Sequence, residues 1–305
     1  MDALGDLLRG VRADGALFGR EVLTDDWERS CPRGAALELF LVVRGTARIA
    51  GAGCEPRTLR AGDATIACTT APFALTSTGP GAGETELVSG YYELEGAVGR
   101  RLTSALPPFL VVPAEDECMP IVELIAAEIA ADRPGRQYVM DRMLDWLLAC
   151  TLREWFDLPE SRPPAWYRAL GDDVVGPALR ALHEDPARPW TVASLAARAQ
   201  VSRAAFARRF ADLVGRPPMA YVTDWRMTLA AELLTEPGAT VASVAARVGY
   251  ADGFGFSDAF KRTRGVTPSG YRASRAAEAA AGAGAGAGST VAERVDPDSW
   301  LRVAG

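Results

Sequence analysis

One pattern constrains the fold of this chain more than any other: two short helices joined by a tight turn, found twice. The first copy is TVASLAARAQVSRAAFARRFADLVG at 191–215. Thr191 is a favourable N-cap for the first helix, and Ser202 is one for the second. Gly215 stands where a glycine usually ends a helix. The segment therefore predicts a helix-turn-helix, whose second helix can enter the major groove of DNA.

The pattern recurs at 240–265. Thr240 caps its first helix, a turn follows at Gly249, and the second helix passes through Phe256 and Phe260 to Gly265. The intervening segment PPMAYVTDWRMTLAAELL at 217–234 has the spacing of a long connecting helix. Two such units joined by a helix are a far more specific sign of DNA binding than one.

Basic side chains accompany both units. The outward positions of the first predicted recognition helix are Arg203, Ala204, Ala207, Arg208 and Arg209. The second unit ends with Lys261, Arg262 and Arg264. Arginine can donate two parallel hydrogen bonds to guanine or to phosphate, which favours a polyanionic partner.

The charge distribution agrees with a DNA-binding C-terminal half. The chain has a net charge of −6, but residues 165–275 hold 15 basic and 10 acidic side chains, a net of +5. Residues 1–164 hold 16 basic and 25 acidic side chains, a net of −9. This indicates that one part of the chain meets a polyanion, although chance segregation would give the same numbers.

The N-terminal part has the pattern of an all-β domain. LELFLVV at 37–43 is a short, mostly apolar run that ends at a turn, Arg44-Gly45. ATIACTT, FALTS and ETELVSGYYEL continue the series. Short strands between glycine-rich turns favour a β-sandwich or barrel over a parallel sheet.

Helical spacing follows at 118–131 and 138–156, and the second helix is apolar on more than one side. Two interpretations stay open: a helix buried in its own domain, or a helix pair that also forms the seam of a homodimer, with Leu147 and Leu148 in the seam. At the other end of the chain, the Ala/Gly-rich segment 276–290 is expected to be disordered.

Several classes are excluded. No apolar run approaches the roughly 18 residues that span a membrane, and MDALGDLLRG lacks the features of a signal peptide, so a cytoplasmic protein without a membrane partner is expected. The chain has one histidine, His183, which we expect at a helix end near Trp190. We therefore expect no metal, no cofactor, no catalytic residue and no enzymatic activity.

Together the paired units resemble the DNA-binding domain of AraC/XylS-type transcriptional regulators. The resemblance runs from about residue 177 through the closing Gly265, Pro268, Tyr271 and Arg272. In the N-terminal half, Leu39 to Gly45, Leu59, Gly62-Asp63 and LREWF are similar to the cupin-like sensor of the same family.

The resemblance implies an α+β protein in which a cupin-like β-barrel and a helical pair precede an all-α domain of two helix-turn-helix subdomains. The implied segments are a sensor at 1–117, dimerisation helices at 118–157, a linker at 158–176, a DNA-binding domain at 177–275 and a tail at 276–305. The implied partners are double-stranded DNA, RNA polymerase, a small-molecule effector and a second copy of the chain, and the implied role is that of a transcriptional activator.

Family positions carried over to this sequence place Arg203, Ala204, Ala207 and Arg208 on the first recognition helix. On the second they place Gly253, Phe254, Ser257 and Asp258, where the family more often has polar residues and an arginine. We therefore expect the first subdomain to dominate base reading, and Lys261, Arg262 and Arg264 to hold phosphates. Asp258 either accepts a hydrogen bond from cytosine or forms a salt bridge with Arg262.

The sensor lacks the histidines of a metal cupin, so binding of a small apolar or aromatic effector is expected. Its predicted lining is Phe18, Leu37, Leu39, Leu41, Phe73, Tyr91 and Tyr92. The alternative is a filled barrel that serves only as a dimer scaffold.

The cysteines suggest a third interpretation. Cys31 lies between Arg29 and Arg33, and nearby positive charge lowers the pKa of a thiol and favours its oxidation. Cys54 and Cys68 are its candidate partners in a redox sensor. The alternative is that these are small buried apolar residues.

Overall fold

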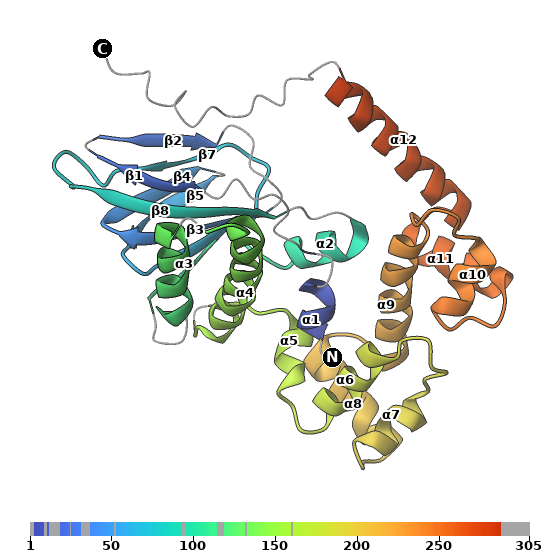
Figure 1. Ribbon diagram of the computed structural model, residues 1–305. Coiled ribbons are helices and arrows are strands. Elements are labelled where there is room, and N and C mark those ends of the chain that lie inside the picture. Colours follow the sequence, from blue (N-terminus) through green and yellow to red (C-terminus); the bar gives the residue numbers. More distant parts are fainter. Residues whose placement is uncertain are drawn as a thin grey trace. The chain divides into compact units, whose positions relative to one another are not determined.

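The computed structural model shows an antiparallel β domain followed by a helical region, so the predicted α+β class is confirmed (Figure 1). The structure describes residues 3–8, 11, 19–24, 26–31, 37–51, 53–92, 96–114, 119–131, 133–159 and 161–287. The chain forms two compact units. Unit 1 comprises residues 1–185 and 190–221, and unit 2 comprises residues 186–189 and 222–305.

The strands of unit 1 form two antiparallel sheets, in the orders β1-β8-β3-β6-β9 and β2-β7-β4-β5. Their bounds are β1 Gly19–Leu23, β2 Glu28–Cys31, β3 Leu37–Arg44, β4 Thr46–Gly51, β5 Cys54–Arg60, β6 Ala64–Ala67, β7 Phe73–Thr76, β8 Thr85–Tyr92 and β9 Phe109–Val112. Non-consecutive strands are neighbours in both sheets, as in barrels and sandwiches with long connections.

A single apolar core draws on both sheets. Phe40 and Val42 come from one sheet, while Ile49, Phe73 and Leu75 come from the other, and none is more than 4% exposed. The Phe73 ring packs edge-on against Phe40, with ring centroids 6.0 Å apart. This aromatic geometry adds specific attraction to the burial of apolar area.

Strand β3 is buried on its other face as well. Leu37, Leu39 and Leu41 pair with Tyr92, Gly90 and Val88 of β8, and all three leucines are 0% exposed. Helix α4 (Arg136–Asp157) covers this face, where Tyr92 Oη donates to the carbonyl oxygen of Leu144 at 2.6 Å. Burial on both faces explains why the run LELFLVV does not alternate with polar residues.

Eleven further helices lie in the described residues. They are α1 Ala3–Leu8, α2 Gly96–Thr103, α3 Met119–Ala131, α5 Ala165–Leu170, α6 Val175–Glu184, α7 Val192–Arg198, α8 Arg203–Val214, α9 Pro218–Leu233, α10 Val241–Arg247, α11 Gly253–Arg264 and α12 Pro268–Ala287. None of the described helices is long and apolar enough to cross a membrane.

Two segments differ from their expected character. The segment expected as a linker, 158–176, contains α5, which packs against α6 and α8. The expectation of disorder from residue 276 was wrong for 276–287, because α12 continues through Ala287. Alanine is the strongest helix former, and it outweighs the interspersed glycines here. Residues 288–305 lie outside the described part of the chain.

Arg226 on α9 connects three backbone segments of unit 2 through hydrogen bonds. Its guanidinium donates to the carbonyl oxygens of Pro186 at 2.8 Å, Arg188 at 2.6 Å and Gly249 at 3.3 Å. The segment 186–189 thereby lies against the turn between α10 and α11. At that turn, a Cβ added to Gly249 would overlap sterically with the carbonyl oxygen of Ala187. Gly249 also has a φ of +81°, which side chains rarely adopt.

We predict that Gly249→Ala lowers the free energy of unfolding of unit 2 by about 3 kcal/mol or more, since strain at positive φ adds to the overlap with Ala187. Gly265→Ala is the matched control, because Gly265 has φ +78° and nothing within 4 Å of an added Cβ. That control should cost about 1 kcal/mol. Native-state hydrogen exchange of the α10 and α11 amides measures both changes, and equal costs for the two variants would contradict this account.

Candidate nucleic-acid interface

Both helix-turn-helix segments begin with the same reciprocal cap. The Thr191 hydroxyl accepts from the Ser194 amide at 3.0 Å, and the Ser194 hydroxyl accepts from the Thr191 amide at 2.9 Å. Thr240 and Ser243 repeat this arrangement with both distances at 3.0 Å. Each cap satisfies backbone donors that the first turn of a helix cannot pair, so α7 and α10 begin where the sequence predicts.

The turns that follow place one residue in the left-handed region. That residue is Gln200 with φ 55° in the first segment and Gly249 in the second. The second helices then begin at side-chain caps: Ser202 accepts from the Ala205 amide at 3.2 Å, and Asp252 accepts from the Gly255 amide at 2.8 Å. Local capping chemistry thus fixes where α8 and α11 start.

Helix α8 buries one face and exposes the other. Phe206 and Phe210 are 0% exposed, and Val214 completes the buried face in place of the predicted Leu213, which is half-buried. On the opposite face Arg203, Ala204 and Arg208 are exposed and Ala207 is half-buried. No hydrogen bond or ion pair engages Arg203 or Arg208 within the part of the chain that the structure describes, so both guanidiniums are available to a polyanion.

Arg209 is placed differently from its neighbour. Its guanidinium makes two parallel hydrogen bonds to the Asp172 carboxylate, with Nη2 to Oδ2 at 2.6 Å and Nε to Oδ1 at 3.0 Å. Asp172 also accepts from the amides of Val174 and Val175 at the start of α6. The hydrogen bond from Arg209 is the main cause that lowers the pKa of Asp172 to about 2. Arg209 therefore ties α8 to the start of α6 while its side chain stays 54% exposed, and its predicted contact with DNA stays a prediction.

Helix α11 resembles α8 in its buried face but not in its exposed one. Phe256 and Phe260 are 0% exposed, whereas Phe254 is 89% exposed. Asp258 is also exposed, and no ion pair joins it to Arg262 among the described residues. The local salt bridge considered for Asp258 is therefore absent from this structure.

Four further predicted contacts on α11 differ in their surroundings. The Ser257 hydroxyl donates to the Gly253 carbonyl oxygen at 2.6 Å. Arg264 is half-buried and donates to the Thr228 hydroxyl on α9 at 2.8 Å, so it packs inside unit 2 rather than facing solvent as expected. Lys261 and Arg262 are exposed at the end of the helix.

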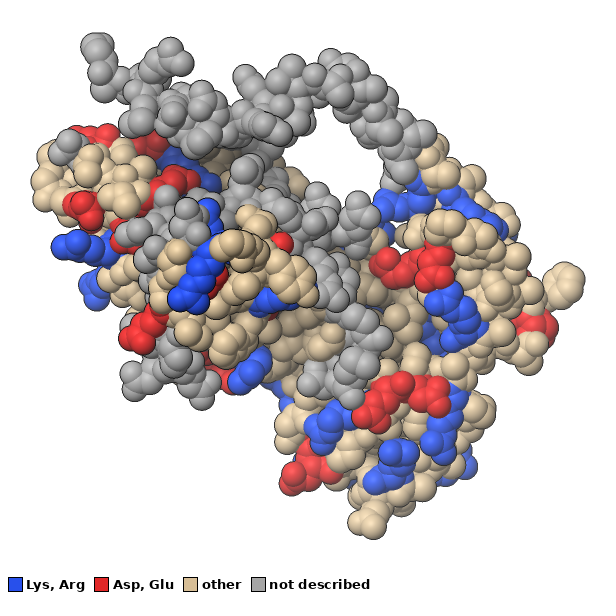
Figure 2. All heavy atoms as spheres, viewed as in Figure 1, with Lys and Arg blue, Asp and Glu red and all other residues tan. Residues whose placement is uncertain are grey.

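The surface view is consistent with a polyanion-binding region. Figure 2 shows Lys and Arg side chains over the helices of both helix-turn-helix segments on the face drawn, with acidic side chains between them. Basic and acidic side chains are thus mixed on this face, and the net charge of +5 over residues 165–275 is a property of the sequence as a whole.

The interior of the β domain holds a polar network that the sequence did not reveal. Arg29 on β2 donates to Tyr91 Oη at 2.8 Å and to Ser89 Oγ at 3.2 Å, and it pairs with Glu21 at 2.8 Å. Its guanidinium also lies 5.3 Å from the centroid of the Phe40 ring. The register of β2 on β7 pairs Arg29 with the core residue Leu75, and this pairing turns Arg29 inward.

The predicted effector lining does not converge on one surface. Phe73 and Tyr91 face the space between the sheets, while Leu37, Leu39, Leu41 and Tyr92 lie on the opposite face, toward α4. Successive residues of a strand alternate between faces, so Phe40 and Val42 take the inward positions that we assigned to the leucines. Phe18 lies outside the described residues.

Burial raises the pKa of two thiols of the β domain. Burial, followed by the charge of Glu38, raises the pKa of Cys31 to about 11 and outweighs the lowering by Arg29. Burial also raises the pKa of Cys68 to about 11. The expectation of a lowered pKa at Cys31 was therefore wrong, and Arg33 lies outside the described residues.

The sheet register separates Cys31 from Cys54. Cys31 pairs with Phe73, Phe73 with Gly51, and Gly51 with Cys54. Three strand spacings of about 4.8 Å place the two Cα atoms roughly 14 Å apart, twice the reach of a disulfide. Among the described residues, Cys31, Cys54, Cys68 and Cys150 are all free thiols.

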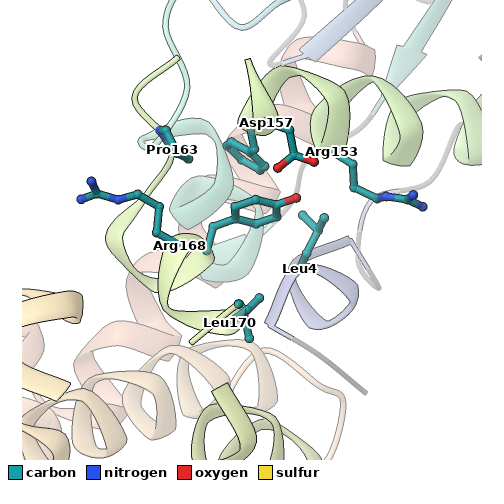
Figure 3. Close-up of a pocket in the computed structure, with 9 residues that line it drawn as sticks. Leu4, Arg153, Asp157, Pro163, Arg168 and Leu170 are labelled. Carbon is teal, nitrogen blue, oxygen red and sulfur yellow. The ribbon is translucent and has the colours of Figure 1, made fainter. Parts of the chain in front are cut away.

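A cavity of about 460 Å³ opens in unit 1 between α1, α4 and α5 (Figure 3). Leu4, Phe156 and Leu170 give it apolar walls, and Asp157 and Tyr167 add polar groups. Figure 3 shows Arg153 and Arg168 extending away from it on opposite sides. No group of three or more His, Cys, Asp and Glu side chains in the described residues has the arrangement of a metal site.

Two family profiles match the two regions of this chain. A family profile described as a cupin matches residues 2–157, and one described as a helix-turn-helix domain matches residues 195–274. A crystal structure of the DNA-binding domain of AdpA, in complex with a target DNA, is 35% identical, covers 32% of this chain and 87% of that one, and has a TM-score of 0.31.

Two relatives match this chain over nearly their whole length. An AraC-like transcription regulator of Streptomyces lividans is 32% identical over 298 residues, which cover 89% of this chain and 98% of that protein. The RCS-specific HTH-type transcriptional activator RclR of Escherichia coli (strain K12) is 28% identical and covers 89% of this chain and 97% of its own length. The chain belongs to the AraC-type family of DNA-binding transcriptional regulators with a cupin-like N-terminal domain.

Proposed function

We propose that this chain binds specific duplex DNA sequences as a homodimer and regulates transcription in response to a small-molecule effector. The observation that carries the proposal is the exposed face of α8, where Arg203 and Arg208 stand beside Ala204 without partners in the described chain. The small alanine side chains allow close approach to a groove, and the arginines supply bidentate donors to guanine.

The division of roles follows from where each cation lies. Arg208 projects from the middle of the exposed face of α8 and is assigned to a base edge. Lys261 and Arg262 lie exposed in the last turn of α11 and are assigned to phosphates. Phosphate contacts set the position of a protein on DNA without reading sequence, whereas base contacts read it.

Dimerisation is assigned to the exposed apolar side chains of α3 and α4. Leu124 is 48% exposed, Val139 is 36% exposed and Trp146 is 52% exposed. Val139 and Trp146 are seven residues apart on α4 and share one face. Leu147 and Leu148, which were predicted to lie in the seam, are at most 2% exposed within unit 1, so the proposed seam excludes them.

The effector is assigned to the cavity between α1, α4 and α5. Its volume of about 460 Å³ suits a small molecule, and its walls come from described residues of three helices. Helix α5 packs against α8, so a ligand with different affinities for two positions of α5 would shift the first recognition helix. RNA polymerase is the partner through which an activator of this kind would act.

Base reading is tested first. Selection from a random duplex library with the full chain should return one motif. Arg208→Ala should then bind that motif more weakly by about 1–3 kcal/mol and lose preference at one base pair. Arg262→Ala should weaken binding to every sequence alike and reduce the salt dependence, because one phosphate contact is lost.

Arg209→Ala is the control for Arg208. It should lower the stability of unit 1 through the loss of the Asp172 pair while leaving the preferred sequence unchanged. If Arg208→Ala weakens selected and scrambled DNA equally, the assignment of Arg208 to a base is wrong.

The dimer seam is tested with Trp146→Glu. A charge in the centre of an apolar interface is costly, so this variant should be monomeric at micromolar concentration, where the wild type sediments as a dimer in analytical ultracentrifugation. Leu147→Glu should instead unfold unit 1, because it buries a charge in a packed core. A dimeric Trp146→Glu would show that the seam lies elsewhere.

The effector site is tested by native mass spectrometry of the protein purified without denaturation. The wild type should retain a small organic molecule in the cavity, and Leu170→Trp, which narrows the cavity, should lose it.

Elemental analysis should find less than about one tenth of an equivalent of transition metal, since no imidazole or thiolate cluster is present in the described residues. A stoichiometric metal ion whose removal alters DNA affinity would contradict the expectation that the protein binds no metal.

A further inference from the structure

Phe254 is the most exposed of the large apolar side chains in the described residues. It is 89% exposed, whereas the other phenylalanines of the same helix, Phe256 and Phe260, are 0% exposed. An aromatic ring left in water gains nothing from the hydrophobic effect, so its position contributes no packing energy to unit 2.

The surroundings of Phe254 leave the ring unshielded. Gly253 and Gly255 flank it, and they present no side chain of their own. A Cβ added at Gly253 would meet only Val241, at 4.0 Å, and one at Gly255 only the Asp252 carboxylate, at 3.6 and 3.9 Å. Phe254 therefore lies exposed in the first turn of α11 with no side chain on either neighbouring residue.

The first turn of the second helix is where a helix-turn-helix contacts base edges. Phe254 occupies that turn, and Asp258 lies one helical turn further on the same face. Ser257, between them, donates its hydroxyl hydrogen to the Gly253 carbonyl oxygen and does not offer it to a base. The exposed face of α11 thus combines an apolar ring with an acceptor-only carboxylate.

We infer that Phe254 reads thymine in the major groove through the C5-methyl group of that base. A phenyl ring makes no hydrogen bond to a phosphate, a sugar or a base edge. Of the groups that the four bases present in the major groove, the thymine methyl is the apolar one. This inference rests on the proposed sequence-specific binding of duplex DNA, and it makes α11 a base-reading helix rather than only a phosphate-binding one.

The test removes the methyl group from the DNA. After the preferred motif has been selected with the wild-type chain, each thymine of the motif is replaced singly by deoxyuridine, which differs only by lacking that methyl. At one position the wild type should lose about four- to tenfold in affinity, the size expected for one lost methyl contact. Phe254→Ala should show the same loss on thymine DNA and no further loss on deoxyuridine DNA at that position.

A matched control is Val266→Ala, which truncates another exposed apolar side chain, 45% exposed and just beyond the end of α11. It should keep the wild-type discrimination between thymine and deoxyuridine. Because Phe254 is exposed, its truncation should leave the thermal unfolding of the chain unchanged, so a loss of affinity reports on the interface.

The outcomes separate this inference from the proposal beneath it. If no motif is selected, sequence-specific binding itself fails. If a motif is selected but deoxyuridine has no effect at any position, the reading of thymine by Phe254 is overturned while specific binding stands. The reading of thymine is also overturned if Phe254→Ala impairs transcription without changing DNA affinity, since the ring would then contact a protein.

Discussion

The burial of strand β3 on both faces is the constraint on which the rest of unit 1 depends. Phe40 and Val42 point into the core between the sheets, and Leu39 points toward α4. The strand thus joins the sandwich core to the helix that carries the exposed side chains of Val139 and Trp146. If one face of β3 were polar and exposed to solvent, α4 would have no apolar surface to pack against. The orientation of Val139 and Trp146 on α4 would then not be fixed.

Helix capping determines where the helices of the two helix-turn-helix segments begin and end. Reciprocal caps at Thr191 and Thr240 and left-handed glycines at Gly215 and Gly265 fix the ends of the helices. Since these devices use small and polar residues, the remaining positions of α8 and α11 are free to differ. They do differ: α8 exposes arginine and alanine, and α11 exposes phenylalanine and aspartate.

The sequence predicts the features that local chemistry decides. The caps, the terminal glycines and the buried phenylalanines of α8 and α11 follow from spacing alone, because each depends on residues within one or two turns. The partner of Arg209 could not be predicted in this way, since Asp172 is 37 residues away. The faces of β3 could not be predicted either, because the run is apolar except at Glu38, and Glu38 is itself buried on the inward face with Phe40.

The segment 186–189 has a consequence for how the DNA-binding region is divided. It precedes α7 in the sequence, yet it belongs to unit 2, where Arg226 binds its carbonyl oxygens. The polypeptide thus enters the second unit, returns to the first for α7 and α8, and enters the second again at Val222. The two helix-turn-helix copies are therefore not separable modules. A fragment that begins at residue 222 contains the second copy but lacks residues 186–189, whose carbonyl oxygens Arg226 binds.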